Sequence, residues 1–390
     1  MKQKIISYLS TEKDDLHKLC KFLYDNPEES YKEFKSCEYI TNFLKQRDFL
    51  VEQKFLGINN SFIAKKGSGH PKICYLCEYD AIKDLGHVTG HNLLTTISIT
   101  AAIGLSKAVD VLGGSVILIG CPGEYLGGTK LTMVRQGVFN DMDAVMEVHP
   151  DVITYESGTS SAIIPLNVSF LGADGLSFLN TEPFNSLDAI LMCFSMINSL
   201  QKGISKDVEI NSILSKGGST PLLAPIESEA KFHIKAKDMD LAMLVENKIK
   251  EICYYVSKLM QIRHSSSLYE PPREELLTNI TLNRLFSHNL KENGIIDICP
   301  PKELSTGLSL GCVSHTTPSI HPYVSIIEKN SQIKYGTKEF ASATLTDFAQ
   351  DEAFKAALSL IFTGLDLLES ENLLSEVKSE FFTFKKDKIY

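Results

Sequence analysis

Acidic and imidazole side chains gather in one short loop that follows a short apolar run and precedes a long one. The loop contains Glu78, Asp80, His87 and His91. Two later apolar runs are each followed by one such group, Glu124 and His149 respectively. Carboxylates and imidazoles are the side chains that hold divalent metals or exchange protons near neutral pH. These residue types in this pattern therefore indicate a metal site or an acid–base site.

The elements that must bring these groups together form a repeating unit. Strands are predicted at 73–76, 115–120 and 144–148, and helices at about 93–108 and 128–137. This alternation is typical of a parallel sheet that is covered by helices on both faces. Ligand sites in such sheets lie beyond the carboxyl ends of the strands, so Asp80, Glu124 and His149 are expected to converge there. Asn92 is the expected N-cap of the first helix.

Residues 161–270 have a different hydrophobic pattern, with alternating runs, and are predicted to form an inserted domain. Alternating strands are expected at 162–170, 208–214, 226–236 and 261–269, with helices at about 186–202 and 239–260. Helix pairs on one face of an antiparallel sheet make a small α+β layer. The remaining chain, 1–160 and 271–390, should form the α/β domain, with further helices at 11–26, 31–48 and about 345–368 and a short charged tail after Phe384.

Composition narrows the function further. A length of 390 residues favours two domains, and 43% hydrophobic with 22% charged residues is typical of a soluble globular protein. A net charge of −9 without a clustered Lys/Arg face argues against nucleic acid and acidic membranes as partners. We expect no signal peptide and no membrane span. Nine scattered cysteines favour reduced thiols, so we expect a cytoplasmic protein. The partner that we expect at the strand-end site is a small-molecule ligand.

The loop at 86–92, G-H-V-T-G-H-N, resembles the G-H-A-C-G-H-[D/N] loop of a family of zinc amidohydrolases. That family includes aminoacylases, hippurate hydrolase, p-aminobenzoyl-glutamate hydrolase and related carboxypeptidases. The E-Y-D-A at 78–81 resembles the E-Y-D-A-L-P of one branch, and the resemblance extends to about residue 323. It implies a phosphorylase/hydrolase-like, parallel-rich sheet covered by helices. It also implies an inserted ferredoxin-like lid at 161–270, through which two chains form a homodimer.

In that family, two divalent metals activate one water for attack on an amide carbonyl. The resemblance carries over His91 and His149 as metal ligands and Glu124 as the general base. The family's shared Cys, its second Glu and its C-terminal His are replaced by Thr89, Tyr125 and Gly336. Because only two of five ligands remain, we expect no dinuclear centre. An empty site is favoured over one loosely held ion, which would bind His91 and His149.

Residues with which the family binds substrate and stabilises the oxyanion are replaced as well. Gly175 stands where the lid His stabilises the oxyanion, Leu222 where the lid carries an Asn, and Lys235 where it carries an Arg. The side chains that are expected to line the substrate site are His87, Asp80, Tyr125, Thr89, Lys235 and His321.

Three functions remain open. The first is a repurposed enzyme that acts on a small amide, N-acyl amino acid or peptide-like compound, with Glu124 and either His91 or His149 as an acid–base pair. The second is a non-catalytic binding or scaffold subunit, in which the histidines bond neighbouring loops and Glu124 caps a helix. The third is an ordinary metal-dependent amide hydrolase. It ranks lowest, because it needs several substitute ligands to converge, for instance Glu78, Asp80 or Cys121.

Overall fold

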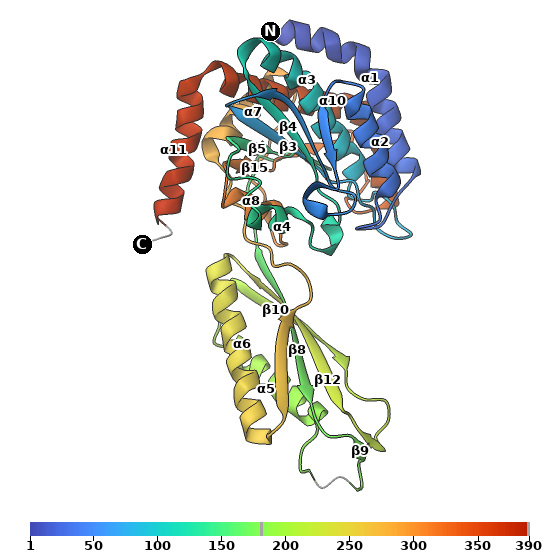
Figure 1. Ribbon diagram of the computed structural model, residues 1–390, viewed down its shortest axis with the longest axis vertical. Coiled ribbons are helices and arrows are strands. Elements are labelled where there is room, and N and C mark those ends of the chain that lie inside the picture. Colours follow the sequence, from blue (N-terminus) through green and yellow to red (C-terminus); the bar gives the residue numbers. More distant parts are fainter. Residues whose placement is uncertain (180–181, 388–390) are drawn as a thin grey trace. The chain divides into compact units, whose positions relative to one another are not determined.

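The computed structural model describes residues 1–179 and 182–387, and the chain divides into two compact units. The first unit comprises Met1–Thr159, Leu276–Glu303 and Cys312–Tyr390, and the second comprises Ser160–Glu275 and Leu304–Gly311. The chain passes between the units within β7 (Thr159–Ser160) and β14 (Glu303–Leu304). Figure 1 labels the elements of both units.

The first unit is built on a six-stranded sheet in the order β1-β2-β4-β3-β5-β15. The strands are β1 (Leu50–Gln53), β2 (Phe62–Ser68), β3 (Lys72–Cys77), β4 (Gly114–Gly120), β5 (Ala144–Met146) and β15 (Ser319–Ile320). The last four of these strands pair in parallel, whereas β1 and β2 form an antiparallel edge. A second parallel pair, β6 (His149–Asp151) and β16 (Tyr323–Ser325), follows β5 and β15 in the chain. The predicted parallel-rich α/β class is confirmed.

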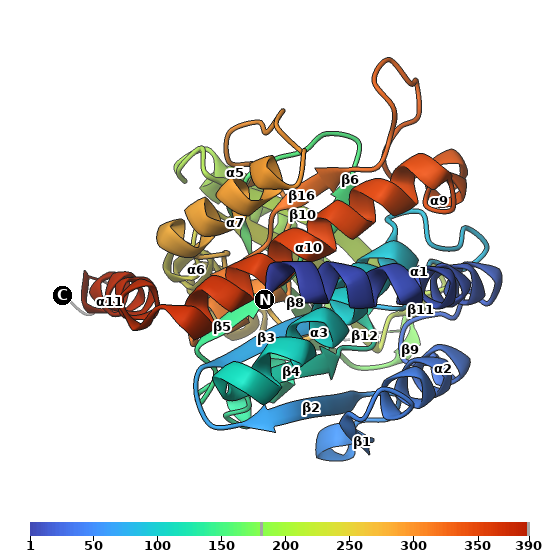
Figure 2. The same cartoon turned by 90° about the horizontal axis from the view of Figure 1, so that it is seen from above.

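One apolar helix, α3 (His91–Leu112), packs directly on β2, β3 and β4. Two further helices, α1 (Lys2–Asp25) and α10 (Asp347–Glu369), pack over α3 (Figure 2). Gly104 allows this close approach, because a Cβ there would overlap the Ile361 side chain of α10. Of the helices that the structure describes, α3 alone is long and apolar enough to cross a membrane, but 83% of its apolar window is buried. It is therefore the central helix of the core.

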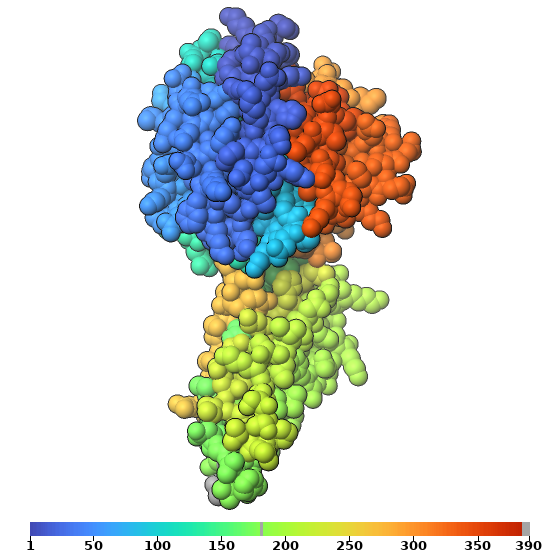
Figure 3. Space-filling view, turned by 90° about the vertical axis from the view of Figure 1, so that its right-hand side faces the viewer, coloured from blue at the N-terminus to red at the C-terminus, as the bar shows by residue number. Residues whose placement is uncertain are grey.

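Other helices surround this core. They are α1 (Lys2–Asp25), α2 (Phe34–Lys45), α4 (Lys130–Arg135), α7 (Ile280–Glu292), α8 (Leu310–Ser314), α9 (Lys338–Ala343), α10 (Asp347–Glu369) and α11 (Glu371–Asp387). Two 3-10 turns, η1 (Phe55–Gly57) and η2 (Glu124–Leu126), complete the set. On the surface of the first unit, the N-terminal helices (blue) lie beside the C-terminal section (orange-red), as Figure 3 shows.

Several local expectations were wrong. Asn92 is not the N-cap of α3, because the helix begins at His91 after Gly90, which adopts φ +84°. The Asn92 amide instead donates to Thr344 Oγ1 at 2.9 Å, inside the helix layer. The expected charged tail after Phe384 continues α11 as far as Asp387, and Lys388 lies outside the described residues. The helix α7 was not predicted.

The second unit is a four-stranded antiparallel sheet in the order β10-β12-β8-β13, and it carries two helices. Its elements are β8 (Ala162–Leu171), α5 (Ser186–Gln201), β10 (Val208–Lys216), β12 (Glu227–Ala236), α6 (Met239–Met260) and β13 (Arg263–Leu268), plus the short pair β9 (Gly175–Leu176) and β11 (Leu223–Ala224). Asn185 and Asp238 cap α5 and α6 with their side chains. The unit has its own core, in which Phe170 and Phe232 are fully buried.

We predict that the protein is a homodimer paired through the second unit. Both edge strands of its sheet are exposed, and α6 exposes Tyr255 (64%) and Leu259 (71%). Light scattering at micromolar concentration should give twice the chain mass of 43.3 kDa. The substitutions Tyr255→Glu and Leu259→Glu should lower that mass, whereas Leu50→Glu, at an 81% exposed position of the first unit, should not. A monomeric wild type contradicts the prediction.

Candidate active site

Polar side chains converge beyond the carboxyl ends of three parallel strands of the first unit. Asp80 follows β3, Glu124 opens η2 after β4, and His149 opens β6 after β5. His91, the first residue of α3, lies between them, with its ring centroid 5.8 Å from that of His149. The structure therefore gathers the groups that the strand-end argument singled out.

His91 is held in one orientation by Asp80. Its Nδ1 lies 2.8 Å from Asp80 Oδ1, and its ring stacks on Tyr125 at 4.7 Å between centroids. Asp80 is itself fixed, because its Oδ2 accepts from Ser30 Oγ at 2.6 Å and from the Tyr125 backbone N–H at 3.0 Å. Burial would lower the pKa of His91, but the Asp80 carboxylate raises it to about 9. Asp80 therefore both orients the His91 imidazole and raises its pKa.

His149 is held by its own strand. Its Nδ1 lies 2.8 Å from the Pro150 carbonyl oxygen, which leaves Nε2 to face the cluster. Burial, together with the nearby charge of His91, lowers the pKa of His149 to about 4. The ring of His321 lies 5.6 Å from that of His149, and burial lowers its pKa to about 3. Both rings are therefore neutral near pH 7.

A buried lysine lies among three carboxylates of this cluster. Lys130, the first residue of α4, is fully buried. Its Nζ forms an ion pair with Glu78 and lies 3.3 Å from Glu124 Oε2 and 3.7 Å from Glu147 Oε2. Burial would lower its pKa, but these carboxylates hold it well above the usual value. Lys130 is therefore a permanent cation in the site.

Glu78 and Glu147 are buried neighbours whose pKa values are shifted in opposite directions. Burial would raise the pKa of Glu78, but the charges of Lys130 and His91 hold it below its usual value. Burial, reinforced by the Glu78 charge, raises the pKa of Glu147 well above its usual value. The two carboxyl groups therefore titrate as a coupled pair, with the pKa of Glu147 above that of Glu78.

Glu78, His91 and His149 form a set that can hold one divalent ion. One ligand atom from each lies within 4.8 Å of the others, and Glu78 Oε2 is 3.4 Å from His91 Nε2. Both imidazoles use Nδ1 for a hydrogen bond and keep Nε2 for the cluster, with Asp80 in the carboxylate–histidine arrangement of metal sites. Three ligands of this kind suffice for a catalytic zinc. The expectation that no metal is bound is therefore not supported.

The same residues do not fit a second ion in the way that the family pattern requires. At the expected positions of Cys and Glu, Thr89 Oγ1 and the Tyr125 hydroxyl bond to each other. These are neutral groups that satisfy one another. Gly336 has no side chain to offer, and the adjacent Tyr335 lies with its ring 6.1 Å from that of His149.

Other predicted site residues lie in different surroundings. His87 is 1% exposed, and its Nε2 bonds the Leu23 carbonyl of α1 at 3.1 Å, so it ties the loop to a helix. Lys235 lies on β12 of the second unit and pairs with Glu209. Cys121 is buried and bonds the Ile119 carbonyl, and burial raises its thiol pKa well above the usual range. The assignments of His87 and Lys235 as substrate-binding residues stay predictions.

Sequence reasoning missed Lys130 and Glu147, and it therefore counted too few charges at the site. Glu147 interrupts an otherwise apolar strand run, A-V-M-E-V, where a lone carboxylate needs a buried partner. Lys130 follows Gly127-Gly128-Thr129, a glycine-rich turn just beyond a strand end. Both signals were present, but neither identified the partner residue, because a helix, two turns and a strand separate Lys130 from Glu147 in the chain.

Glu33 supports the turn that carries Glu124. It is fully buried, and its Oε1 accepts from the Gly123 backbone N–H at 2.7 Å. Gly123 has φ +81°, and a Cβ there would overlap the Tyr31 ring, so the turn requires glycine. Burial, with the Asp80 charge nearby, raises the pKa of Glu33 to about 7.

We predict that Glu33 makes stability fall as pH rises. An acid whose folded pKa is raised stabilises the fold fully below its ordinary pKa of 4.5, and that contribution is lost as pH rises through about 7. The substitution Glu33→Gln keeps an acceptor for Gly123 and should remove the loss, up to about 3 kcal/mol in free energy of unfolding. Urea unfolding at about pH 5 and about pH 8 measures it, with the exposed Glu38→Gln as control. Equal pH dependence in all three proteins refutes it.

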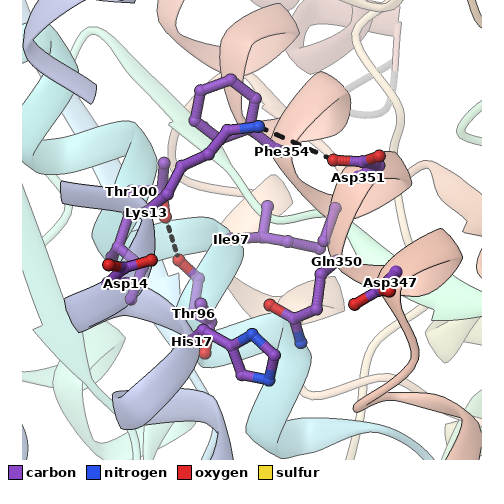
Figure 4. Close-up of a pocket in the computed structure, with 12 residues that line it drawn as sticks. Lys13, Asp14, His17, Thr96, Ile97, Thr100, Asp347, Gln350, Asp351 and Phe354 are labelled. Carbon is purple, nitrogen blue, oxygen red and sulfur yellow. Dashed lines mark hydrogen bonds and ion pairs between the residues drawn. The ribbon is translucent and has the colours of Figure 1, made fainter. Parts of the chain in front are cut away.

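A polar pocket of about 400 Å³ lies elsewhere in the first unit, between α1, α3 and α10 (Figure 4). Lys13 Nζ lies 3.6 Å from Asp351 Oδ1, and the Thr96 and Thr100 hydroxyls bond carbonyls of their own helix. These groups are engaged with one another or with backbone, and the described residues that line the pocket include no nucleophile paired with a base.

Comparison with known proteins finds relatives among hydrolases. No family model matches the chain. Xaa-Arg dipeptidase of Mus musculus is 26% identical over 98% of this chain and 92% of its own length. One of the p-aminobenzoyl-glutamate hydrolase proteins of Escherichia coli is 31% identical, over 59% of this chain and 52% of its own length.

A solved structure shares the fold. It is a dinuclear metal-binding peptidase of the M20 family from Bacillus subtilis, with a TM-score of 0.64 and 14% identity, over 91% of this chain and 98% of that one. The similarity to the dipeptidase spans both units of this chain, and the solved structure has the same architecture. The curated relatives of this chain are therefore amidohydrolases and peptidases, Xaa-Arg dipeptidase and p-aminobenzoyl-glutamate hydrolase among them, and its fold is that of the M20 peptidase structure.

Proposed function

We propose that this protein hydrolyses the amide bond of a small amino-acid conjugate, at a centre that has lost the two-metal arrangement. The observation that carries the proposal is the convergence of Glu124, His91 and His149 at the strand ends of the first unit. A carboxylate with only 14% of its side chain exposed lies there 3.3 Å from Lys130, which also pairs with Glu78, the carboxylate that faces His91. Such a combination is typical of acid–base catalysis.

The substrate class rests on the relatives. Their names describe enzymes that act on an Xaa-Arg dipeptide and on p-aminobenzoyl-glutamate. Both compounds consist of an amino acid that is linked through an amide. An N-acyl amino acid or a dipeptide-like compound is therefore the class of substrate that we propose here.

Glu124 is the proposed general base. It is placed on a rigid turn by Gly123 and Glu33, and Lys130 lies 3.3 Å from its Oε2. A carboxylate in this position can take the proton of a water that attacks the amide carbonyl. When no ion is bound, His149, which is neutral at pH 7, can orient the water or the carbonyl through its Nε2.

One divalent ion would fit Glu78, His91 and His149. When bound, it would supply Lewis-acid polarisation and a more acidic water. Of the suggested substitute ligands Glu78, Asp80 and Cys121, Glu78 is the one whose ligand atom lies within 4.8 Å of ligand atoms of both His91 and His149. This favours a one-ion variant of the metal-dependent hydrolase over a site without any ion.

A binding or scaffold role is the alternative, and one observation favours it. Thr89 and Tyr125 hydrogen-bond to each other at the positions of two family ligands, so this part of the site is stabilised without a bound ion. A protein of this kind would bind an amino-acid conjugate without cleaving it.

The test is a hydrolysis assay on a panel of N-acyl amino acids and dipeptides, with zinc, manganese or cobalt added singly. We predict turnover by the wild type, and a loss of at least about a hundredfold in Glu124→Gln, since general-base catalysis contributes that much or more. The surface substitution Glu52→Gln on β1 should retain wild-type turnover.

Two outcomes would contradict the proposal. Equal turnover by Glu124→Gln removes Glu124 as the base. Absence of turnover in the folded wild type with every metal, together with binding of a conjugate by calorimetry, establishes the binding role instead.

A further inference from the structure

Lys130 occupies a position where three separate strand ends each contribute a carboxylate. Glu78 follows β3, Glu124 follows β4 and Glu147 follows β5, and all three approach the same ammonium group. A fully buried lysine is costly unless anions surround it, and three buried or nearly buried carboxylates are costly unless a cation lies among them. The lysine and the three carboxylates therefore stabilise one another in the folded protein.

Glu78 joins this cation to the candidate ion site. One of its oxygens pairs with Lys130, and the other, Oε2, lies 3.4 Å from His91 Nε2. The ammonium and an ion held by Glu78, His91 and His149 would therefore be neighbours that share one carboxylate. A second divalent ion would have to approach Lys130 closely, where like charges repel strongly in a poorly solvated environment.

On the remaining side of the cluster, the described residues that replace the family's ligands give a second ion no anionic group. Thr89 and Tyr125 are bonded to each other, and Tyr125 is committed to the stack on His91. Near Gly336, an added Cβ would meet nothing within 4 Å, so that position is open. Asp80 is committed to His91 and to the Tyr125 N–H, so the other described carboxylates of the site that could attract a second ion are those around Lys130.

We propose that the ammonium group of Lys130 takes the place of a second metal ion, so that this centre accepts one divalent cation and excludes another. The inference deepens the proposed function, because it describes the same site. It concerns ion stoichiometry, and it holds whether or not an amino-acid conjugate is cleaved.

The experiment counts ions per chain in the absence of any substrate. The protein is stripped with chelator, dialysed against zinc and, separately, manganese, and analysed by elemental mass spectrometry and calorimetry. The wild type and Lys130→Arg, which keeps a cation, should each bind one equivalent. Lys130→Met should bind a second equivalent through Glu124 and Glu147, and Lys18→Met, at an exposed ion pair with Asp15, should match the wild type.

Stability provides a second measurement, because Lys130→Met leaves three carboxylates without their cation. Added zinc should raise the thermal midpoint of Lys130→Met by more than that of the wild type. The double variant Lys130→Met/Glu147→Gln removes the cation together with one of its three acidic partners, so it should fold without metal and bind its second equivalent more weakly than the single variant.

Three results would overturn the inference. The first is two equivalents in the wild type. The second is one equivalent with unchanged affinity in a folded Met variant. The third is failure of both Met variants to fold even in excess zinc while Lys130→Arg folds, because a divalent ion then cannot replace the ammonium. Since none of these measurements uses a substrate, a negative hydrolysis assay leaves their meaning intact.

Discussion

The contact between Lys130 and the carboxylates of three strand ends is the interaction on which the site depends. Fixed charges in a buried space must be nearly balanced, or the fold becomes unstable. Lys130 provides that balance without a bound ion and holds Glu78 where it can reach His91. Asp80 plays the matching role on the other side, since it fixes His91 and the turn at Tyr125 together. The site is thus preorganised by its own charges.

The architecture around the site was largely predictable, because it follows from apolar periodicity. Buried parallel strands leave continuous apolar runs, and the polar residue that ends each run must lie at the same edge of the sheet. This argument placed Asp80, Glu124 and His149 together without any knowledge of relatives. It failed for Asn92, whose side chain bonds Thr344 across the helix layer, since a long-range partner replaced the local cap.

The composition of the cluster was less predictable, because it depends on pairs of residues that are distant in the sequence. Lys130 and Glu147 meet only after a strand, two turns and a helix have folded, and no local pattern links them. The family resemblance drew attention to Thr89, Tyr125 and Gly336, which differ from the family's ligands, and away from Lys130 and Glu147. A lone charge in an apolar strand is a signal that should prompt a search for its partner.

Gly336 also limits which substitutions could add a metal ligand to this site. Its backbone adopts φ +80°, a conformation that side chains with a Cβ rarely tolerate. A mutation that put a histidine there would have to rebend the loop as well as add a ligand, and Tyr125 would still stack on His91. A histidine at position 336 alone would therefore not complete a two-ion site, because the Thr89–Tyr125 pair would also have to be replaced.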